Sequence, residues 1–346
     1  SSGILKLPTL TTIGDFSNIS INEVIKWASN NNITLEQTYE YSDLIESNHI
    51  ISQDVPANTL LKGVKKIEVI VSNGPNYESI VNIPNMIGWN VDDVVAKIKE
   101  AKLNNVQIDF EFNEVTERDI EFEQSKSGEM RRNEELILKF SLGREEDLEP
   151  VNLKELKDME EFDAILWLKR NGIKYEIEYE FSDTTEAGKV ISTTPEADTL
   201  IVQLETTVKI IISKGPKITA PDFTKMSLDE ITEWAIKNKI TIVYESEYNN
   251  DIKAGSVIRV SVKEGDILEE NDRIYIVTSK GSLKMFSYTD GDIVALRNFA
   301  AEHKITLTEN EEFSDTIEKG KFISVSLKPG DIINTGDEIT VVVSLG

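Results

Sequence analysis

The chain repeats one pattern five times, and this repetition constrains its fold more than any other feature of the sequence. A Ser-Xaa-Gly step closes an apolar run at Gly74, Gly143, Gly215, Gly281 and Gly346, with successive spacings of 69, 72, 66 and 65 residues. Between 32 and 35 residues before each glycine begins a second pattern, a glutamate, an aromatic residue and two polar residues. Its copies are Glu40-Tyr41-Ser42-Asp43, Glu111-Phe112-Asn113-Glu114, Glu180-Phe181-Ser182-Asp183, Glu247-Tyr248-Asn249-Asn250 and Glu312-Phe313-Ser314-Asp315. Two patterns in one register predict tandem domains.

The closing glycines set the predicted domain boundaries. We expect repeat 1 over residues 1–75, repeat 2 over 76–143, repeat 3 over 144–215, repeat 4 over 216–281 and repeat 5 over 282–346. Domains of this size are near the lower limit for a self-sufficient core. The sequence therefore predicts five small cores rather than one large one.

Repeat 4 shows most clearly what each domain contains. Ser227 followed by Glu230 is the pattern of a helix N-terminus, and apolar residues at helical spacing come directly after it. From Ile240 onward apolar and polar residues alternate, which predicts a strand, and two further short apolar runs predict two more strands. We therefore expect an α+β fold in which one helix packs on a three-stranded antiparallel sheet. Short connections predict end-to-end stacking into an elongated rod, on the order of 150 Å at roughly 25–30 Å per domain.

Composition excludes several classes of partner. The net charge is −25, from 62 acidic and 37 basic residues spread along the 346-residue chain. Such a chain repels phosphate backbones, anionic lipids and anionic wall polymers, so we expect no nucleic acid partner and no direct membrane contact. The absence of cysteine excludes disulfides and thiolate sites. No run of 18 apolar residues is present, and the opening Ser1-Ser2-Gly3 resembles neither a Met start nor a signal peptide, so we expect a fragment of a longer protein.

Several local motifs resemble PASTA repeats. They are Ile83-Pro84-Asn85-Met86-Ile87-Gly88-Trp89, Ala187-Gly188-Lys189-Val190-Ile191, Leu327-Lys328-Pro329-Gly330-Asp331, Val71-Ser72-Asn73-Gly74 and Val343-Ser344-Leu345-Gly346. The resemblance spans essentially the whole chain and implies the outer region of a bacterial membrane serine/threonine kinase. It also implies an extracytoplasmic location at the cell surface, tethered by a transmembrane helix outside this fragment, and contact with peptidoglycan or muropeptides.

The sequence contains no group of residues typical of a catalytic site. The two histidines, His49 and His303, occupy non-equivalent positions, and no kinase motif or Ser-Xaa-Xaa-Lys is present. Carboxylate clusters such as Glu145-Glu146-Asp147 do not recur at one place in the repeats, which favours solvated surface over glycosidase chemistry. We expect no catalysis in the fragment, no cofactor and no metal site.

Two rows of aromatic residues recur along the repeats. Trp27, Trp167, Trp234 and Phe299 share one position on the helix, where we favour core packing over stacking on sugars. Tyr41, Phe112, Phe181, Tyr248 and Phe313 share the position before a polar turn, where we favour anchoring of that turn. If a ligand site exists, repeat 5 is our first choice, with Phe313, Ser314, Asp315 and Pro329 as its candidate residues.

These observations lead to one functional hypothesis with two alternatives. We expect a non-catalytic, monomeric segment that senses or contacts the wall, in which several weak sites act together. The first alternative is a purely structural surface spacer. The second is the C-terminal PASTA region of a penicillin-binding protein.

Overall fold

The computed structural model describes residues 11–346. The opening Ser1-Ser2-Gly3 and the predicted start of repeat 1 lie outside the described residues. The chain divides into two compact units. The first unit runs to Ala220 and also includes Thr232–Thr241 and Gly265–Asp272. The second unit consists of Pro221–Ile231, Ile242–Glu264 and Arg273–Gly346.

One α-helix occurs in each of the five repeats. The helices are α1 (Ile21–Asn30), α2 (Val91–Glu100), α3 (Glu161–Arg170), α4 (Leu228–Asn238) and α5 (Ile293–Glu302), with short 3₁₀ helices η1 (Glu145–Asp147) and η2 (Phe223–Lys225). The expected N-terminus of α4 is confirmed. Glu230 N donates to Ser227 Oγ at 3.2 Å, and Ser227 N donates to the Glu230 carboxylate at 2.8 Å, so the two residues satisfy each other's backbone amides.

Each repeat also contains one three-stranded sheet. The first strands are β1 (Thr34–Glu40), β5 (Val106–Glu111), β10 (Lys174–Glu180), β15 (Thr241–Glu247) and β19 (Thr306–Glu312). The second strands are β2 (Ile50–Gln53), β6 (Glu121–Gln124), β11 (Val190–Thr194), β16 (Val257–Val260) and β20 (Phe322–Val325). The last strands are β3 (Lys66–Ser72), β8 (Leu136–Ser141), β13 (Thr207–Ser213), β18 (Arg273–Ser279) and β21 (Glu338–Ser344). The predicted α+β class, with one helix and three strands per repeat, is confirmed.

The predicted strand direction was wrong. In every sheet the last strand lies in the centre, between the first and second strands. The second strand pairs with it antiparallel, but β1, β5, β10 and β19 pair with their central strands in parallel. The reason is burial, because the last strand carries the most apolar side chains, as at Ile67, Val69 and Val71 in β3. A strand this apolar takes the centre, and the first strand then joins it through a crossover rather than a hairpin.

Short ribbons extend some of the repeats. Three two-stranded pairs occur in the described residues: β4 (Ile80–Ile83) with β7 (Gly128–Arg131), β9 (Val151–Asn152) with β12 (Leu200–Ile201), and β14 (Ile218–Thr219) with β17 (Ile267–Leu268). Single bridges, Thr12 with Leu60 and Lys284 with Ile332, occupy the matching places in repeats 1 and 5. The extended segment that opens each repeat is thus held by the turn before its last strand.

Separate apolar cores lie in the repeats, as their small size predicts. Repeat 2, for example, buries Val94 and Ile98 of α2 against Leu136 and Phe140 of β8. Comparable clusters in repeats 1, 3 and 5 also join helix residues to central-strand residues.

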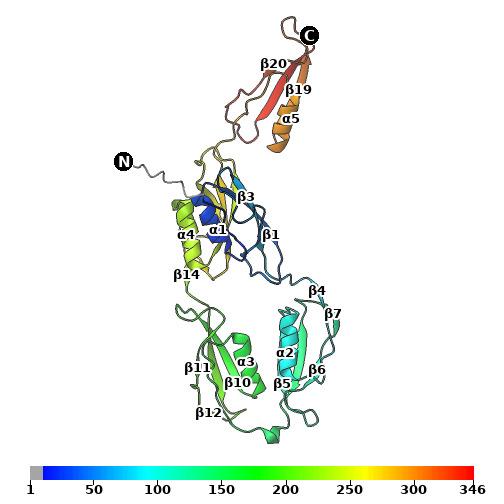
Figure 1. The fold of residues 1–346 in the computed structure, drawn as a ribbon, viewed down its shortest axis with the longest axis vertical. Helices are drawn as coiled ribbons and strands as arrows, with labels where there is room; N and C mark the ends of the chain where they lie inside the picture. The colour runs from blue at the N-terminus through cyan, green and yellow to red at the C-terminus, as the bar shows by residue number, and fades with distance from the viewer. Residues whose placement is uncertain (1–10) are drawn as a thin grey trace, which may run out of the picture. The chain divides into compact units, whose positions relative to one another are not determined.

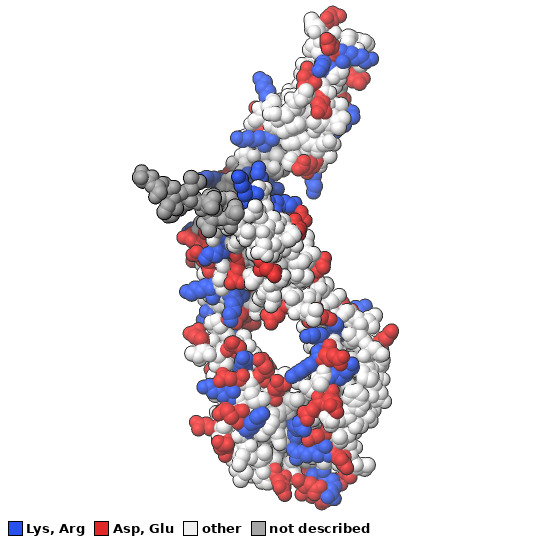
Figure 2. Space-filling model, viewed as in Figure 1, with Lys and Arg blue, Asp and Glu red and all other residues white. Residues whose placement is uncertain are grey.

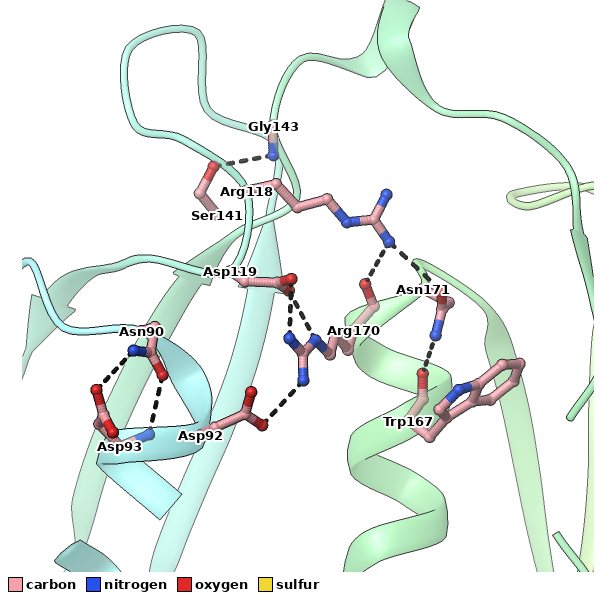
Figure 3. A network of polar contacts seen from close by, with 10 residues as sticks. All are labelled: Asn90, Asp92, Asp93, Arg118, Asp119, Ser141, Gly143, Trp167, Arg170 and Asn171. Carbon is pink, nitrogen blue, oxygen red and sulfur yellow. Dashed lines mark hydrogen bonds and ion pairs between the residues drawn. The ribbon is translucent and has the colours of Figure 1, made fainter. Parts of the chain in front are cut away.

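Repeats 2 and 3 meet along their helices, within one compact unit. Figure 1 shows α2 and α3 side by side, and Leu166 of α3 packs against the core of repeat 2. Figure 3 shows Arg170 of α3 binding two carboxylates of repeat 2: Asp119 through two hydrogen bonds of 3.0 and 3.1 Å, and Asp92 at 3.0 Å. Lys99 of α2 in turn binds Asp163 of α3 at 3.0 Å.

This contact corrects the end-to-end stacking that we predicted for neighbouring repeats. The connection between repeats 2 and 3 is the longest charged one, running from Gly143 through η1, and it lets the chain turn back. Complementary charges then hold the two helices together. The rod over all five repeats stays a prediction.

Candidate functional site

In each repeat, the serine of the closing Ser-Xaa-Gly motif joins two backbone segments through hydrogen bonds. We call this arrangement the clasp. Each hydroxyl is buried at the end of the central strand, donates to a carbonyl oxygen 25 to 28 residues earlier at 2.6–2.7 Å, and accepts from the amide of the closing glycine at 2.9–3.1 Å. The donor and acceptor pairs are Ser72 with Ile45, Ser141 with Thr116, Ser213 with Thr185, Ser279 with Ile252 and Ser344 with Ile317. The Ser-Xaa-Gly motif is therefore structural.

The polar turn in the second sequence pattern is hydrogen-bonded to the same closing motif. The side-chain oxygens of Ser42, Asn113, Ser182, Asn249 and Ser314 accept backbone amides two and three residues later, at 2.8–3.4 Å. In repeats 1 to 4 the backbone amide of this residue also donates to the carbonyl of the closing glycine, at 2.8–2.9 Å. The two sequence patterns thus recur in register because their residues are hydrogen-bonded to each other.

The aromatic residue before this turn points largely into solvent. Tyr41 is 60% exposed, Phe181 39%, Tyr248 45% and Phe313 83%, whereas Phe112 is half-buried. In repeats 3 and 4 a lysine of the closing motif covers the ring: Lys214 Nζ lies 5.4 Å from the Phe181 centroid, and Lys280 Nζ lies 5.3 Å from that of Tyr248. These are cation–π distances.

Phe313 stands apart from its counterparts. Repeat 5 has Leu345 where repeats 3 and 4 have the covering lysine, and within the described part of the chain no ring or cation contacts Phe313. The anchoring role that we favoured for this position does not account for a ring that is 83% exposed. The Phe313 ring is thus an exposed apolar surface.

The structure brings three of the four predicted site residues together. Phe313, Ser314 and Asp315 follow the C-terminal end of β19, where Glu312 pairs with Ser344. Pro329 lies past the end of β20, in a turn where Gly330 N donates to the Met285 carbonyl. Because β20 runs antiparallel to β21, whose end neighbours Phe313, Pro329 and Phe313 lie at opposite ends of the sheet. One small ligand does not span both.

The helix aromatics pack against the cores, as we favoured. Trp27, Trp167 and Phe299 are half-buried against the clusters of repeats 1, 3 and 5. Trp27 also meets Phe16 edge-on at 4.9 Å, and Phe299 lies 4.7 Å from Phe286. Trp27, Trp167 and Phe299 are therefore core residues rather than a surface for stacking on sugars.

The sequence analysis missed one unusual carboxylate, Glu121. Its side chain is 1% exposed in β6, and neither carboxylate oxygen has a hydrogen-bond partner in residues 11–346. Burial raises the pKa of Glu121 to about 7. In the other repeats the matching strand position holds Ile50, Val190, Val257 or Phe322. Alignment of the five second strands would have revealed the substitution.

The described residues offer little other site chemistry. Among residues 11–346 no three His, Cys, Asp or Glu side chains gather so that they could hold a metal ion. Every helix in that range falls short of the length and apolar character of a membrane span. Figure 2 shows acidic and basic side chains interspersed over the visible face. Exposed rings beside the clasp are therefore the leading candidates for a binding surface.

Four of the five repeats match one known family of domains. The PASTA domain model matches residues 11–73, 151–214, 218–280 and 287–345, well over half of the chain. Repeat 2, which contains Glu121, has the same helix and strand order but lies outside the matched spans.

Two curated relatives that the chain resembles are serine/threonine-protein kinases. The chain is 26% identical over 199 residues to the probable serine/threonine-protein kinase pknA2 of Bifidobacterium longum, covering 52% of this chain and 26% of the relative. It is 26% identical over 207 residues to the serine/threonine-protein kinase PrkC of Bacillus subtilis, covering 57% and 31%. The chain thus spans about a quarter to a third of these relatives. The entire extracellular region of the Ser/Thr kinase PrkC from Staphylococcus aureus is 24% identical, with 60% and 75% covered and a TM-score of 0.22.

Proposed function

Because the chain belongs to the PASTA domain family, we propose that it is a non-catalytic extracytoplasmic segment of a bacterial serine/threonine kinase that contacts peptidoglycan or muropeptides. The family assignment and the kinase relatives support this proposal. In it, the repeats act outside the cell as a monomeric segment tethered by a membrane helix elsewhere in the parent protein. Kinase motifs and an apolar span ahead of Ser1 in the complete sequence would agree with it.

The exposed ring of Phe313 is the observation that carries the proposal. An aromatic face that is 83% exposed offers apolar area to the C–H face of a sugar ring without first breaking a contact within the protein. Ser314 and Asp315 lie beside it and present polar atoms to sugar hydroxyls. One such contact is weak, and the partly exposed Tyr41, Phe181 and Tyr248 in other repeats supply further weak contacts.

The net charge of −25 shapes how this contact can work. Anionic wall polymers are repelled at long range, and the repulsion weakens as salt rises. Stacking on an uncharged glycan depends little on salt. Purified peptidoglycan freed of anionic polymers is therefore the appropriate target.

The test is sedimentation of the whole chain with purified sacculi at two salt concentrations. We expect saturable binding that Phe313→Ala weakens several-fold at both concentrations. Tyr275→Ala is the matched control, because Tyr275 is a 48% exposed aromatic residue on β18, away from the polar turn. Absence of binding by the unmodified chain would contradict the proposal and favour the structural spacer.

A further inference from the structure

A polar cavity lies where repeats 4 and 5 meet, within one compact unit. Its volume is about 770 Å³, within the range of small-molecule sites. Repeat 4 contributes Tyr248, Asn249 and Asn250, and repeat 5 contributes His303, Thr306 and Thr335. The cavity is separate from the Phe313 turn, because Thr306 begins β19 and Phe313 follows its other end.

The walls of the cavity are held by direct contacts between the repeats. Asn250 Nδ2 donates to the Ile333 carbonyl at 3.2 Å and to Asn334 Oδ1 at 3.0 Å. The Asn334 backbone amide donates to Asp337 at 2.7 Å, which fixes the loop that carries Asn334. These bonds give the cavity a defined shape before any ligand enters.

Two aromatic rings line one side. The centroids of Tyr248 and His303 lie 5.5 Å apart at 79°, and His303 in turn lies 4.6 Å from Phe299, which packs on the core of repeat 5. Among the described residues, neither the Tyr248 hydroxyl nor either ring nitrogen of His303 has a hydrogen-bond partner. The Tyr248 hydroxyl and the His303 ring nitrogens are therefore available for hydrogen bonds to a ligand.

The chemistry of the lining selects an uncharged, hydroxyl-rich ligand. Amide, hydroxyl and imidazole groups offer both donors and acceptors, which matches hydroxyl groups that do both. Only three charged residues line the cavity, Lys304, Asp251 and Asp337, and their formal net charge of −1 disfavours an anionic ligand. The cavity of about 620 Å³ between repeats 2 and 3 differs, because Phe162, Ile165 and Leu166 make its lining mainly apolar.

We propose that the cavity between repeats 4 and 5 binds a short stretch of uncharged glycan. This inference rests on the proposed wall contact and names a place for it that is distinct from Phe313. A glycan held here touches both repeats at once, so binding also fixes repeat 5 against repeat 4.

The test fills the cavity without removing any of its hydrogen bonds. Thr306→Trp places a large side chain in the cavity, and Thr308→Trp is the matched control, since Thr308 is exposed on the same strand and the same face but outside the lining. Thr335→Trp blocks the cavity from another segment, the exposed turn before β21. The whole chain is titrated with chitotetraose by calorimetry, and its sacculus binding is measured in parallel.

We expect Thr306→Trp and Thr335→Trp each to weaken chitotetraose binding at least tenfold, while Thr308→Trp leaves it unchanged. If the unmodified chain binds sacculi but both cavity variants bind chitotetraose and sacculi equally well, the cavity proposal is overturned and the wall contact stands. If the unmodified chain binds neither target, the wall contact and the cavity proposal both fail.

Discussion

The hydroxyl of Ser213 donates a 2.7 Å hydrogen bond to the carbonyl oxygen of Thr185, and both residues are buried. The hydroxyl oxygen of Ser213 also accepts a hydrogen bond from the backbone amide of Gly215, at 2.9 Å. One side chain therefore satisfies two backbone groups that belong to different segments of the repeat. Because every repeat has this arrangement, its energetics can be tested in one copy.

Ser213→Ala should destabilise repeat 3 by about 1–3 kcal/mol, because the Thr185 carbonyl and the Gly215 amide lose their partner in a buried place. Native-state hydrogen exchange measures this as a lower opening free energy for amides of β10, β11 and β13. Ser192→Ala, at an exposed serine of β11, is the control and should change little. Equal protection in the two variants would show that the clasp contributes nothing to stability.

Gly281→Ala should destabilise repeat 4 more than Gly255→Ala does. Both glycines have positive φ, +76° and +84°, so an alanine at either site costs roughly 1–2 kcal/mol of backbone strain. A Cβ at Gly281 would also lie 3.3 Å from the Ala254 Cβ, whereas nothing lies within 4 Å at Gly255. Hydrogen exchange of the amides of β16 and β18 compares the two variants, and equal losses would mean that the Ala254 contact relaxes freely.

Repeat 2 should become less stable as pH rises, because of Glu121. Its pKa is about 7 when folded, against 4.5 for an ordinary glutamate, so the folded state holds the proton more tightly than the unfolded state. Stability is then highest below pH 4.5 as far as this group is concerned, and falls as pH rises through 7, by on the order of 3 kcal/mol in total.

Glu121→Gln should remove this pH dependence, since an amide of nearly the same shape does not ionise. The opening free energy of repeat 2, measured by hydrogen exchange at pH 5 and pH 8, is the readout. Glu129→Gln, at an exposed glutamate of β7, should retain the dependence of the unmodified chain. A repeat 2 that is equally stable at both pH values before mutation would disprove this assignment.

Arg170→Ala should loosen the contact between repeats 2 and 3. Asp119 and Asp92 lose the guanidinium that holds them, and the loss should resemble the effect of high salt on the unmodified chain. Since the chain has no cysteine, Val115→Cys with Asp183→Cys gives two clean spin-label sites, one exposed in each repeat. In Arg170→Ala, electron paramagnetic resonance should show a broader distribution of distances between the two spin labels than in the chain that keeps Arg170.

Arg131→Ala provides the matched control for this measurement, because Arg131 pairs at 2.8 Å with Glu78 inside repeat 2. Its distance distribution should remain that of the unmodified chain. If Arg170→Ala leaves the distribution equally narrow, the ion pairs of Arg170 are not needed to hold the two helices together, and the Lys99–Asp163 pair and the apolar packing around Leu166 suffice.

The local pattern of the repeats was readable in the sequence because it depends on neighbouring residues. Ser227 and Glu230 lie three positions apart, so their mutual hydrogen bonds follow from helix geometry alone. The core role of Trp27 and Trp167 followed in the same way from helical spacing.

The candidate site was only partly predictable. Phe313, Ser314 and Asp315 are consecutive, so the sequence placed them together, but Pro329 was grouped with them and lies at the other end of the sheet. Their spatial relation depends on which strand takes the centre and in which direction the others run. The buried carboxylate of Glu121 was not predicted from the sequence. In a chain with many exposed carboxylates, a single glutamate gives no sign of burial until its strand partner, Phe140, is known.

Periodicity and local hydrogen bonding were enough to predict the five repeats, the helix and three strands of each, and the turn residues. The parallel pairing of first and last strands, the exposure of Phe313, the burial of Glu121 and the ion pairs of Arg170 instead arise from contacts between distant segments. Each of these depends on which side chains pack together and exclude water, and those side chains come from residues far apart in the chain.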